Sequence, residues 1–389
     1  MKKTIAILGA TGSVGTQAQD VARARGYKVD LISANRDFRA AETAAREFMP
    51  TAVAMADETA AAELRMRLAD TPIKVLSGKE GVCEAIMQSS SDTVVNSILG
   101  EAGLEPTLAV IESGKRLALA NKESLVIAGD IVMSRARDMG VEIIPVDSEH
   151  SAIFQSLRSG RHSEISKLIL TASGGPFFGR GREELELVTL ADTLAHPTWK
   201  MGKKITVDSA TLMNKGFEII EAAHLFDVDE SRIEVVVHRE SILHSAVEFV
   251  DRSIIGELSV PDMRMCVQYA VDYPDRCAGD ATPLDLFSVG SLSFRRPDTE
   301  AFPLLGMAKR SLKDGGGMSA VLNAADEVAV AAFLDGKIGF TAISDTVIHT
   351  YEKMSDAASA TTLEQIIESD RAARRIAEEY TRKLQEAIH

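Results

Sequence analysis

Short apolar runs and amphipathic stretches alternate from the N-terminus to about Val146, a pattern that predicts strands and helices in turn. Strands are expected at Thr4–Leu8, Val29–Ser33, Thr51–Met55, Thr93–Ser97, Arg116–Ala120 and Val141–Val146. Helices are expected in the Ala-, Glu- and Arg-rich stretches Ser13–Arg25, Arg39–Phe48 and Thr59–Leu68. This alternation is typical of an α/β fold with a doubly wound sheet.

The pattern changes after Asp147. Further strands are expected at Lys167–Thr171, Ile233–His238, Ser245–Val250 and Ile254–Val260. The last three follow one another closely, which indicates a partly antiparallel α+β domain. Residues 274–297 show little periodicity and read as a linker, whereas Phe302–His389 is helical in pattern and predicts a small bundle.

Composition narrows the classes of function. The chain has 43 basic and 57 acidic residues, a net charge of −14, which argues against broad binding to nucleic acids or anionic membranes. Cys83, Cys266 and Cys277 lack the spacing of metal ligands. Because no apolar run approaches ~18 residues and the N-terminus lacks the features of a signal peptide, we expect a cytoplasmic protein without a membrane partner.

A glycine-rich turn, Gly9–Gly15, lies between the first expected strand and the first expected helix. Glycines there permit a tight turn and a close approach of the backbone to a pyrophosphate, and the helix N-terminus offers free N–H groups. The spacing is G-x-x-G-x-x-G rather than the commoner G-x-G-x-x-G. A plain glycine turn is the alternative, but the strand–turn–helix context favours a dinucleotide site.

The end of the second strand indicates which dinucleotide binds. NAD-binding proteins usually carry an acid there to hold the ribose 2′-hydroxyl, whereas here the strand ends Ala34-Asn35-Arg36. A 2′-phosphate would be attracted by Arg36, so NADPH is favoured. The alternative is that Arg36 is a solvated surface residue.

Two groups of acidic residues could hold a metal ion. Asp147 and Glu149 follow the last strand of the first domain, and in an extended chain they would point to the same side. Such oxygen ligands suit Mg²⁺ or Mn²⁺, although two acids at a helix start would equally favour the helix dipole. Further on, Asp208 or Ser209 is a plausible N-cap of a helix that runs through Glu218.

On that helix, Asn214 and Lys215 precede Glu218 by four and three residues and so share its face. The face could hold a phosphate at one end and supply a third metal ligand at the other. The alternative is an ordinary i,i+3 salt bridge between Lys215 and Glu218.

Other polar groups follow expected strands or lie in loops. Asn121-Lys122-Glu123 is expected at a carboxyl end of the sheet, and Ser173-Gly174-Gly175 could form an anion nest. The only tryptophan, Trp199, lies in the Gly- and Pro-containing stretch Gly174–Lys204. It predicts either a lid that excludes water or an anchor of the loop to the core.

Taken together, these segments resemble the 1-deoxy-D-xylulose 5-phosphate reductoisomerase family. The motifs that carry the resemblance appear in family order and are Gly9–Gly15, Ala120–Ser124, Pro145–His150, Thr171–Phe177, His196–Gly202, Thr206–Glu221 and Pro261–Arg264. The resemblance implies a metal-dependent rearrangement of the substrate's carbon skeleton. NADPH reduction then gives 2-C-methyl-D-erythritol 4-phosphate in the non-mevalonate isoprenoid pathway.

The resemblance also implies roles for individual residues. Asp147, Glu149 and Glu218 would bind Mg²⁺, Mn²⁺ or Co²⁺, and Lys122 and His196 would join them as catalytic residues. The substrate would contact Lys122, Ser148, Glu149, Ser173, His196, Trp199, Ser209, Asn214, Lys215 and Glu218, with Met201 also in the mobile flap. NADPH would contact Thr11, Gly12, Ser13, Val14, Ala34, Asn35, Arg36, Asn121, Glu123, Gly202 and Met263.

The expected organisation follows. We predict a Rossmann-like NADP-binding domain at 1–147, a central α+β catalytic and dimerisation domain with a flexible flap at 148–273, a linker at 274–298 and a helical domain at 299–389. A homodimer is expected from the family, with the strand-rich run 233–260 as the candidate interface. One departure from the family is the second-strand end, where Ala34-Asn35-Arg36 replaces the usual Gly-Lys-Asn.

Two other functions remain open from the sequence. A plain NADP-dependent dehydrogenase would not need three acidic metal ligands. A non-catalytic NADP or sugar-phosphate sensor would bind without turnover.

Overall fold

The computed structural model describes residues 3–195, 199 and 201–388. Contacts divide the chain into two compact units. The first consists of Met1–Ser124, Val132–Phe154 and Asp262–Pro283, and the second of Leu125–Ile131, Gln155–Pro261 and Leu284–His389. Among the described residues, no helix is both long enough and apolar enough to cross a lipid bilayer.

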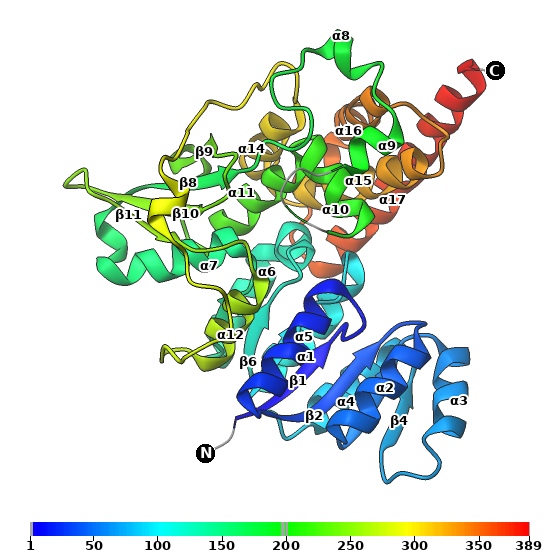
Figure 1. The fold of residues 1–389 in the computed structure, drawn as a ribbon. Helices are drawn as coiled ribbons and strands as arrows, with labels where there is room; N and C mark the ends of the chain where they lie inside the picture. Colours follow the sequence, from blue (N-terminus) through cyan, green and yellow to red (C-terminus); the bar gives the residue numbers. More distant parts are fainter. Residues whose placement is uncertain (1–2, 196–198, 200, 389) are drawn as a thin grey trace. The chain divides into compact units, whose positions relative to one another are not determined.

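The first unit is built on a parallel sheet, whose described residues form seven strands in the order β4-β3-β2-β1-β5-β6-β7 (Figure 1). The strands are β1 (Thr4–Leu8), β2 (Lys28–Ala34), β3 (Ala52–Met55), β4 (Lys74–Ser77), β5 (Thr93–Asn96), β6 (Arg116–Leu119) and β7 (Ile143–Pro145). The helices are α1 (Ser13–Arg25), α2 (Phe38–Phe48), α3 (Glu58–Arg67), α4 (Gly78–Gln88), α5 (Leu104–Glu112) and α12 (Met263–Asp272), together with α6 (Glu123–Met139) and α7 (Ser148–Ser156), of which residues 125–131 and 155–156 are assigned to the second unit.

The strand order places a switch point beside β1. β1 pairs with β2 on one side and with β5 on the other, so the chain winds outwards in both directions from it. Ligands of such sheets bind outside the carboxyl ends of the strands at this reversal. The predicted doubly wound, Rossmann-like fold is confirmed, and the glycine turn after β1 lies where a cofactor is expected.

The strands of the first sheet other than β4 fall within two residues of their predicted bounds, because nearly all of their residues are buried. One strand was not predicted, β4. It lies at the edge of the sheet, where its first residue is exposed and the other three are only half-buried. A four-residue edge strand gives no apolar run that stands out from the sequence around it.

The second unit contains a mixed sheet, whose described strands run in the order β11-β10-β8-β9. The strands are β8 (Ile165–Ala172), β9 (Ile233–Val237), β10 (Leu243–Phe249) and β11 (Ile254–Leu258). β8 is parallel to β9 and antiparallel to β10, which is antiparallel to β11. The predicted partly antiparallel α+β region is confirmed.

Helices make up the rest of this unit. They are α8 (Arg182–Leu185), α9 (Leu190–Leu194), α10 (Lys203–Ala210), α11 (Met213–Phe226), α13 (Leu286–Val289), α14 (Leu304–Asp314), α15 (Met318–Leu334), α16 (Phe340–Lys353) and α17 (Leu363–Ile388). Short 3₁₀ helices are η1 (Glu101–Gly103) in the first unit, η2 (Leu157–Ser159), η3 (His162–Glu164), η4 (Glu230–Arg232) and η5 (Ser355–Ser359). α15 is buried over most of its surface and packs against α14, α16 and α17, which confirms the predicted helical C-terminal region.

The glycine turn supplies a test of how tightly α1 packs on β1. A Cβ atom on Gly15 would lie 2.2 Å from the carbonyl oxygen of Gly9, so backbone would have to move. We expect Gly15→Ala to lower the free energy of unfolding by about 1–3 kcal/mol through overpacking. Gly306→Ala is the control, because Gly306 is also helical and a Cβ there meets nothing within 4 Å. Denaturant midpoints that fall equally for both variants would contradict this interpretation.

Candidate active site

Backbone hydrogen bonds fix the turn after β1 in front of the N-terminus of α1. Gly9 adopts φ 72°, Ala10 N–H donates to the Ser33 carbonyl at 2.8 Å, and Gly12 N–H donates to the Gly9 carbonyl at 2.9 Å. α1 then begins at Ser13, and the glycine at its N-cap offers no side chain to satisfy the first N–H groups. The predicted cofactor residues Thr11, Gly12, Ser13 and Val14 therefore lie where a pyrophosphate would find helix N–H groups and positive partial charge.

The end of β2 carries a cation beside an acid. Arg36 is 83 % exposed at its side chain, and its Nε lies 3.3 Å from Asp57 Oδ2. Asp57 caps α3 by accepting the Ala60 N–H at 2.9 Å. That hydrogen bond lowers the pKa of the Asp57 carboxyl, and the charge of Arg36 lowers it further. Arg36 is thus exposed enough to contact a 2′-phosphate, but its charge is already paired with the Asp57 carboxylate.

The Asn121 side chain forms hydrogen bonds within the loops around it. It is 2 % exposed, and its Nδ2 lies 2.7 Å from the Ile98 carbonyl and 3.0 Å from Glu123 Oε2. Its Oδ1 accepts the Ser124 N–H at 3.0 Å. The side chain therefore ties the segment after β5 to the start of α6. Both Asn121 and Glu123 remain predicted cofactor contacts, with side chains already engaged by each other.

The first pair of acids lies at the junction of β7 and α7. The chain is not extended here, and the alternative of a helix start holds: α7 begins at Ser148, and the Asp147 carbonyl accepts the Ser151 N–H at 2.8 Å. The two side chains nevertheless converge, because Asp147 and Glu149 each offer a carboxylate oxygen within 4.8 Å of the other. The helical turn gives the proximity that strand alternation was expected to give.

Neighbouring groups hold these carboxylates in place. Lys122 Nζ lies 2.7 Å from Asp147 Oδ2, and both side chains are nearly buried. His150 Nδ1 lies 4.0 Å from the same oxygen. Ser148 Oγ donates to Glu149 Oε2 at 2.6 Å. Lys122, Asp147, Ser148 and Glu149, all predicted site residues, are therefore brought together within the first unit.

A second polar group is built on α10 and α11. The prediction that Asp208 or Ser209 caps a helix through Glu218 is wrong, because both lie in the last turn of α10. The chain breaks at Leu212, which adopts φ 59°, and α11 starts at Met213. A leucine gives no sequence signal for this left-handed conformation, so a single longer helix was expected.

The predicted face of α11 is confirmed. Asn214 Nδ2 donates to Glu218 Oε1 at 2.6 Å, and Lys215 Nζ forms an ion pair with Glu218 Oε2. The side chains of Lys215 and Glu218 are 5 % and 1 % exposed. The i,i+3 salt bridge that was the alternative is therefore present, and burial excludes water from it.

Two glycines bring the loop after β8 against α10. Gly174 and Gly175 adopt φ 78° and 63°, and a Cβ on Gly175 would lie 2.6 Å from the Ser209 carbonyl oxygen. Gly175 N–H points to Ser173 Oγ at 3.3 Å. The loop of Ser173 and the C-terminal end of α10 with Ser209 are therefore neighbours, as a shared phosphate site requires.

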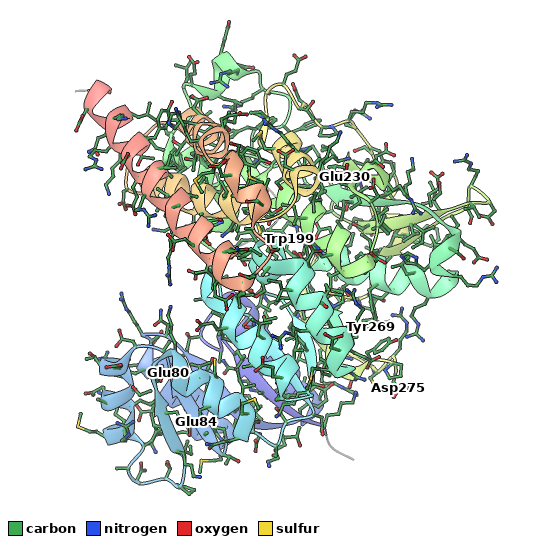
Figure 2. The ribbon with its side chains drawn as sticks, turned by 180° about the vertical axis from the view of Figure 1, so that it is seen from behind. Glu80, Glu84, Trp199, Glu230, Tyr269 and Asp275 are labelled. Atoms are coloured by element: carbon green, nitrogen blue, oxygen red, sulfur yellow. The ribbon has the colours of Figure 1, made fainter. Side chains whose placement is uncertain are left out.

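The flap segment is described only in part. Trp199 is half-buried, and its ring centroid lies 6.2 Å from that of His244, which is 5 % exposed (Figure 2). Gly202 lies just before α10 and accepts the Thr206 hydroxyl through its carbonyl at 2.8 Å. Met201 lies directly before it, and His196, predicted as catalytic, lies outside the described residues.

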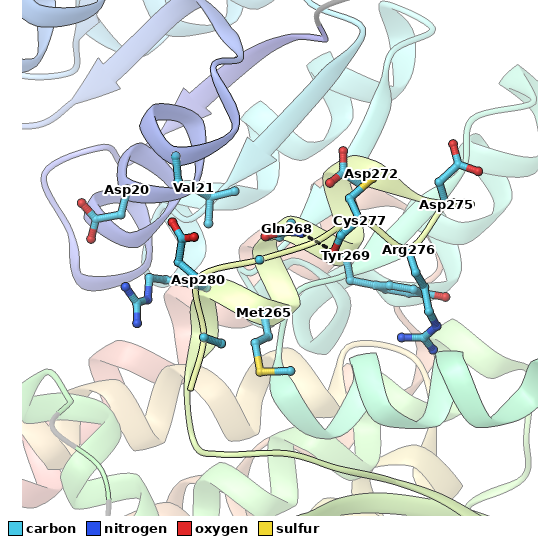
Figure 3. A pocket seen from close by; sticks show the side chains of 14 residues that line it. Asp20, Val21, Met265, Gln268, Tyr269, Asp272, Asp275, Arg276, Cys277 and Asp280 are labelled. Carbon is cyan, nitrogen blue, oxygen red and sulfur yellow. Dashed lines mark hydrogen bonds between the residues drawn. The ribbon is translucent and has the colours of Figure 1, made fainter. Parts of the chain in front are cut away.

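A cavity of about 280 Å³ lies elsewhere in the first unit (Figure 3). It is bounded by the middle of α1, by α12 and by the segment that follows α12. Asp20, Gln268 and Cys277 are among its lining residues. None of the predicted site residues lines it, so it is a separate feature.

Comparison with known proteins agrees with this geometry. Three family models match, the 1-deoxy-D-xylulose 5-phosphate reductoisomerase model over 5–129 and two models of its C-terminal domains over 143–226 and 258–376. A reductoisomerase of that name from Acetivibrio thermocellus is 51% identical over 379 residues, 97% of this chain and 99% of that protein. One from Caldanaerobacter subterraneus is 49% identical over 98% of this chain and all of that protein.

Solved structures give the same result. The Zymomonas mobilis reductoisomerase in complex with NADPH aligns with a TM-score of 0.92 at 39% identity, covering 99% of this chain and 100% of that one. A DOX-P reductoisomerase in complex with NADPH, fosmidomycin and magnesium aligns with a TM-score of 0.93 at 38% identity, covering 99% of both chains. By sequence over its whole length and by fold, the chain belongs to the 1-deoxy-D-xylulose 5-phosphate reductoisomerase family.

Proposed function

We propose that Asp147, Glu149 and Glu218 bind the divalent cation of an NADPH-dependent 1-deoxy-D-xylulose 5-phosphate reductoisomerase, which makes 2-C-methyl-D-erythritol 4-phosphate in the non-mevalonate isoprenoid pathway. The observation that carries the proposal is the convergence of Asp147 and Glu149, whose carboxylate oxygens lie within 4.8 Å of each other. Carboxylate oxygens are the ligands that Mg²⁺ and Mn²⁺ prefer. A relative of the chain was solved with magnesium.

The cation would supply a Lewis acid that polarises the substrate carbonyl and stabilises an alkoxide as it develops. The residues of the chain orient the substrate around it. Lys122, Ser148 and Asn214 would contact hydroxyl or carbonyl oxygens of the substrate. Lys122 already points its ammonium at Asp147, so it lies where such an oxygen would be held beside the metal ligand.

The substrate phosphate would be held by Ser173, Ser209, Asn214 and Lys215. Support comes from the second unit, where the glycine loop after β8 meets the end of α10 and where Lys215 is nearly buried. A buried ammonium attracts a phosphate more strongly than an exposed one, because less water screens it. Binding energy from this remote group can then orient the reacting carbons. Trp199 and His196 of the flap would cover the bound substrate and exclude water.

NADPH would lie on the carboxyl edge of the first sheet. The turn residues Thr11, Gly12, Ser13 and Val14 would hold its pyrophosphate, and Ala34, Asn35 and Arg36 its adenosine end. Asn121, Glu123, Gly202 and Met263 would contact the remainder, with Met263 near the nicotinamide. The nicotinamide supplies the hydride, so the protein's contribution is placement of that ring.

A homodimer in the cytoplasm is proposed as the working form. β11 is an edge strand of the mixed sheet, and Ile254, Ile255 and Leu258 on it are 57%, 38% and 41% exposed. An apolar, unpaired edge invites pairing with another strand. The strand-rich run 233–260 is therefore the proposed interface, with a second copy as its partner.

The first test of the reaction is product formation. With deoxyxylulose phosphate, NADPH and Mg²⁺, the purified protein should consume NADPH and yield a branched polyol phosphate identifiable by NMR. EDTA should stop the reaction and added Mg²⁺ should restore it. Glu218→Gln should lower kcat about 100-fold or more, because several kcal/mol of charge stabilisation is lost, while the Kd for NADPH stays unchanged.

The alternatives give other results. An unbranched product would indicate a plain dehydrogenase, and binding without turnover would indicate a sensor. A turnover rate that EDTA leaves intact would remove the metal from the mechanism. Equal losses in turnover and NADPH affinity in Glu218→Gln would point to misfolding, which a lowered melting temperature would reveal.

The role of Arg36 can be tested through cofactor preference. Arg36→Ala should raise the KM for NADPH about 10- to 100-fold, the size of a lost hydrogen bond between charged groups, and leave the KM for NADH nearly unchanged. Arg39→Ala is the matched control, since Arg39 is also exposed and lies three residues further on. Equal changes for both cofactors would exclude Arg36 from the 2′-phosphate site.

The dimer proposal predicts a change of mass. Replacing Ile254 and Leu258 together by Lys should yield monomers in sedimentation experiments at concentrations where the unaltered chain is dimeric, because charges would be buried without partners. Met66→Lys, on the exposed face of α3 in the first unit, should have no effect. A dimer that persists in the double variant would place the interface elsewhere.

A further inference from the structure

In the second unit, one lysine and two buried acids form a charge cluster next in sequence to the proposed phosphate-binding residue Ser209. Lys204 Nζ, from the first turn of α10, lies 2.7 Å from Asp208 Oδ2 and 3.0 Å from Asp326 Oδ2. The same Nζ lies 5.2 Å from the ring centroid of Phe217. Asp326 belongs to α15 and Phe217 to α11. One ammonium group therefore contacts three helices.

The cluster is costly to bury. Asp208 is 3 % and Asp326 0 % exposed, so two buried acids share one cation, whose own side chain is 30 % exposed. Burial raises the pKa of the Asp326 carboxyl, although Lys204 opposes that shift. Within the described part of the chain, the Asp326 Oδ1 atom has no hydrogen-bond partner. Packed apolar side chains would often stabilise a helix contact as well as such a group does, so stability alone gives little reason for the cluster.

Its position gives a better reason. Asp208 directly precedes Ser209, and it shares the Lys204 ammonium group with Asp326, so the cluster links the end of α10 that carries this serine to α15. Phe217 lies between Lys215 and Glu218 in sequence, so the contact with Lys204 also bears on the functional part of α11. The Lys204 contacts therefore link α10 and α11 to α15. This helix belongs to the C-terminal bundle and carries none of the proposed ligands.

We propose that Lys204, Asp208 and Asp326 form a positioning cluster that locks α10 and α11 onto α15, so that Ser209 and Lys215 are held ready for the substrate phosphate. The inference rests on the proposed phosphate site. A directional ion pair holds a helix in one register, whereas apolar contacts tolerate small slides. A slide of α10 by a fraction of its pitch would move Ser209 out of reach of a phosphate oxygen.

Steady-state kinetics of three variants test the proposal. Asp326→Ala should raise the KM for deoxyxylulose phosphate about tenfold, as expected from a small misplacement of binding groups, with kcat and the KM for NADPH nearly unchanged. Asp326→Asn should restore the original KM, because an amide oxygen still accepts from Lys204. Lys204→Met should match Asp326→Ala, since its apolar stem keeps the packing on Phe217 while the ion pairs are lost.

Glu327→Gln is the matched control. Glu327 is the next residue of α15, but it pairs with Arg374 of α17 at 2.7 Å and not with α10. It should lower the melting temperature without changing the KM for deoxyxylulose phosphate. The inference is overturned if Asp326→Ala and Lys204→Met change only the melting temperature, or if they raise the KM values for substrate and NADPH together.

Lys215→Met separates this inference from the proposed site. If Lys215→Met leaves the substrate KM unchanged, the proposed phosphate site is wrong and the positioning role falls with it. If Lys215→Met raises the KM and the cluster variants do not, the phosphate site stands and only the positioning cluster is rejected. If Asp326→Ala does not fold, the substrate KM of Lys204→Met tests the positioning role instead, because this variant removes the same ion pairs from α10.

Discussion

The structure depends on burying carboxylates beside ammonium groups. Lys122 with Asp147, Lys215 with Glu218 and Lys204 with Asp208 are all pairs from which most water is excluded. An unpaired buried charge is costly, so each lysine offsets part of the cost of burying its acid. The same lysines also explain how an acidic chain can bind phosphorylated ligands. A chain of net charge −14 must bind two phosphorylated ligands, and local cations in a medium of low dielectric constant outweigh a distant, screened surplus of acid.

The fold could be predicted wherever buried elements show a regular spacing of apolar residues in the sequence. β1 and α1 were placed at their observed bounds because the strand is apolar and the glycine turn separates it from the helix. β4 was missed because an edge strand is half-exposed and needs no apolar run. The break between α10 and α11 was missed because Leu212 takes a left-handed conformation that its side chain does not announce, and the surrounding packing imposes it.

The candidate site could be predicted where its parts are local. Asn214, Lys215 and Glu218 share a face through helix geometry alone, and the structure shows those contacts. Asp147 and Glu149 were expected to converge through strand alternation, and they converge through a helical turn instead, so the proximity was right and its cause was wrong. The contact of Lys204 with Asp326 spans 122 positions of sequence, and only tertiary packing of α10 on α15 creates it.

The two proposed phosphate sites of the chain would work under different physical conditions. Arg36 is exposed, so its attraction for a 2′-phosphate is weakened by water and salt and is shared with Asp57. Lys215 is buried and fixed by Glu218, so its attraction acts at short range on a group that has already been placed. A solvated cation suits a cofactor that must exchange in every cycle, because weak contacts are quickly broken. A rigid, desolvated clamp suits the substrate, because its phosphate is the fixed point from which the reacting carbons are oriented. In the proposed arrangement, the contacts of Lys204 with Asp208, Asp326 and Phe217 would supply that rigidity by tying α10 and α11 to α15.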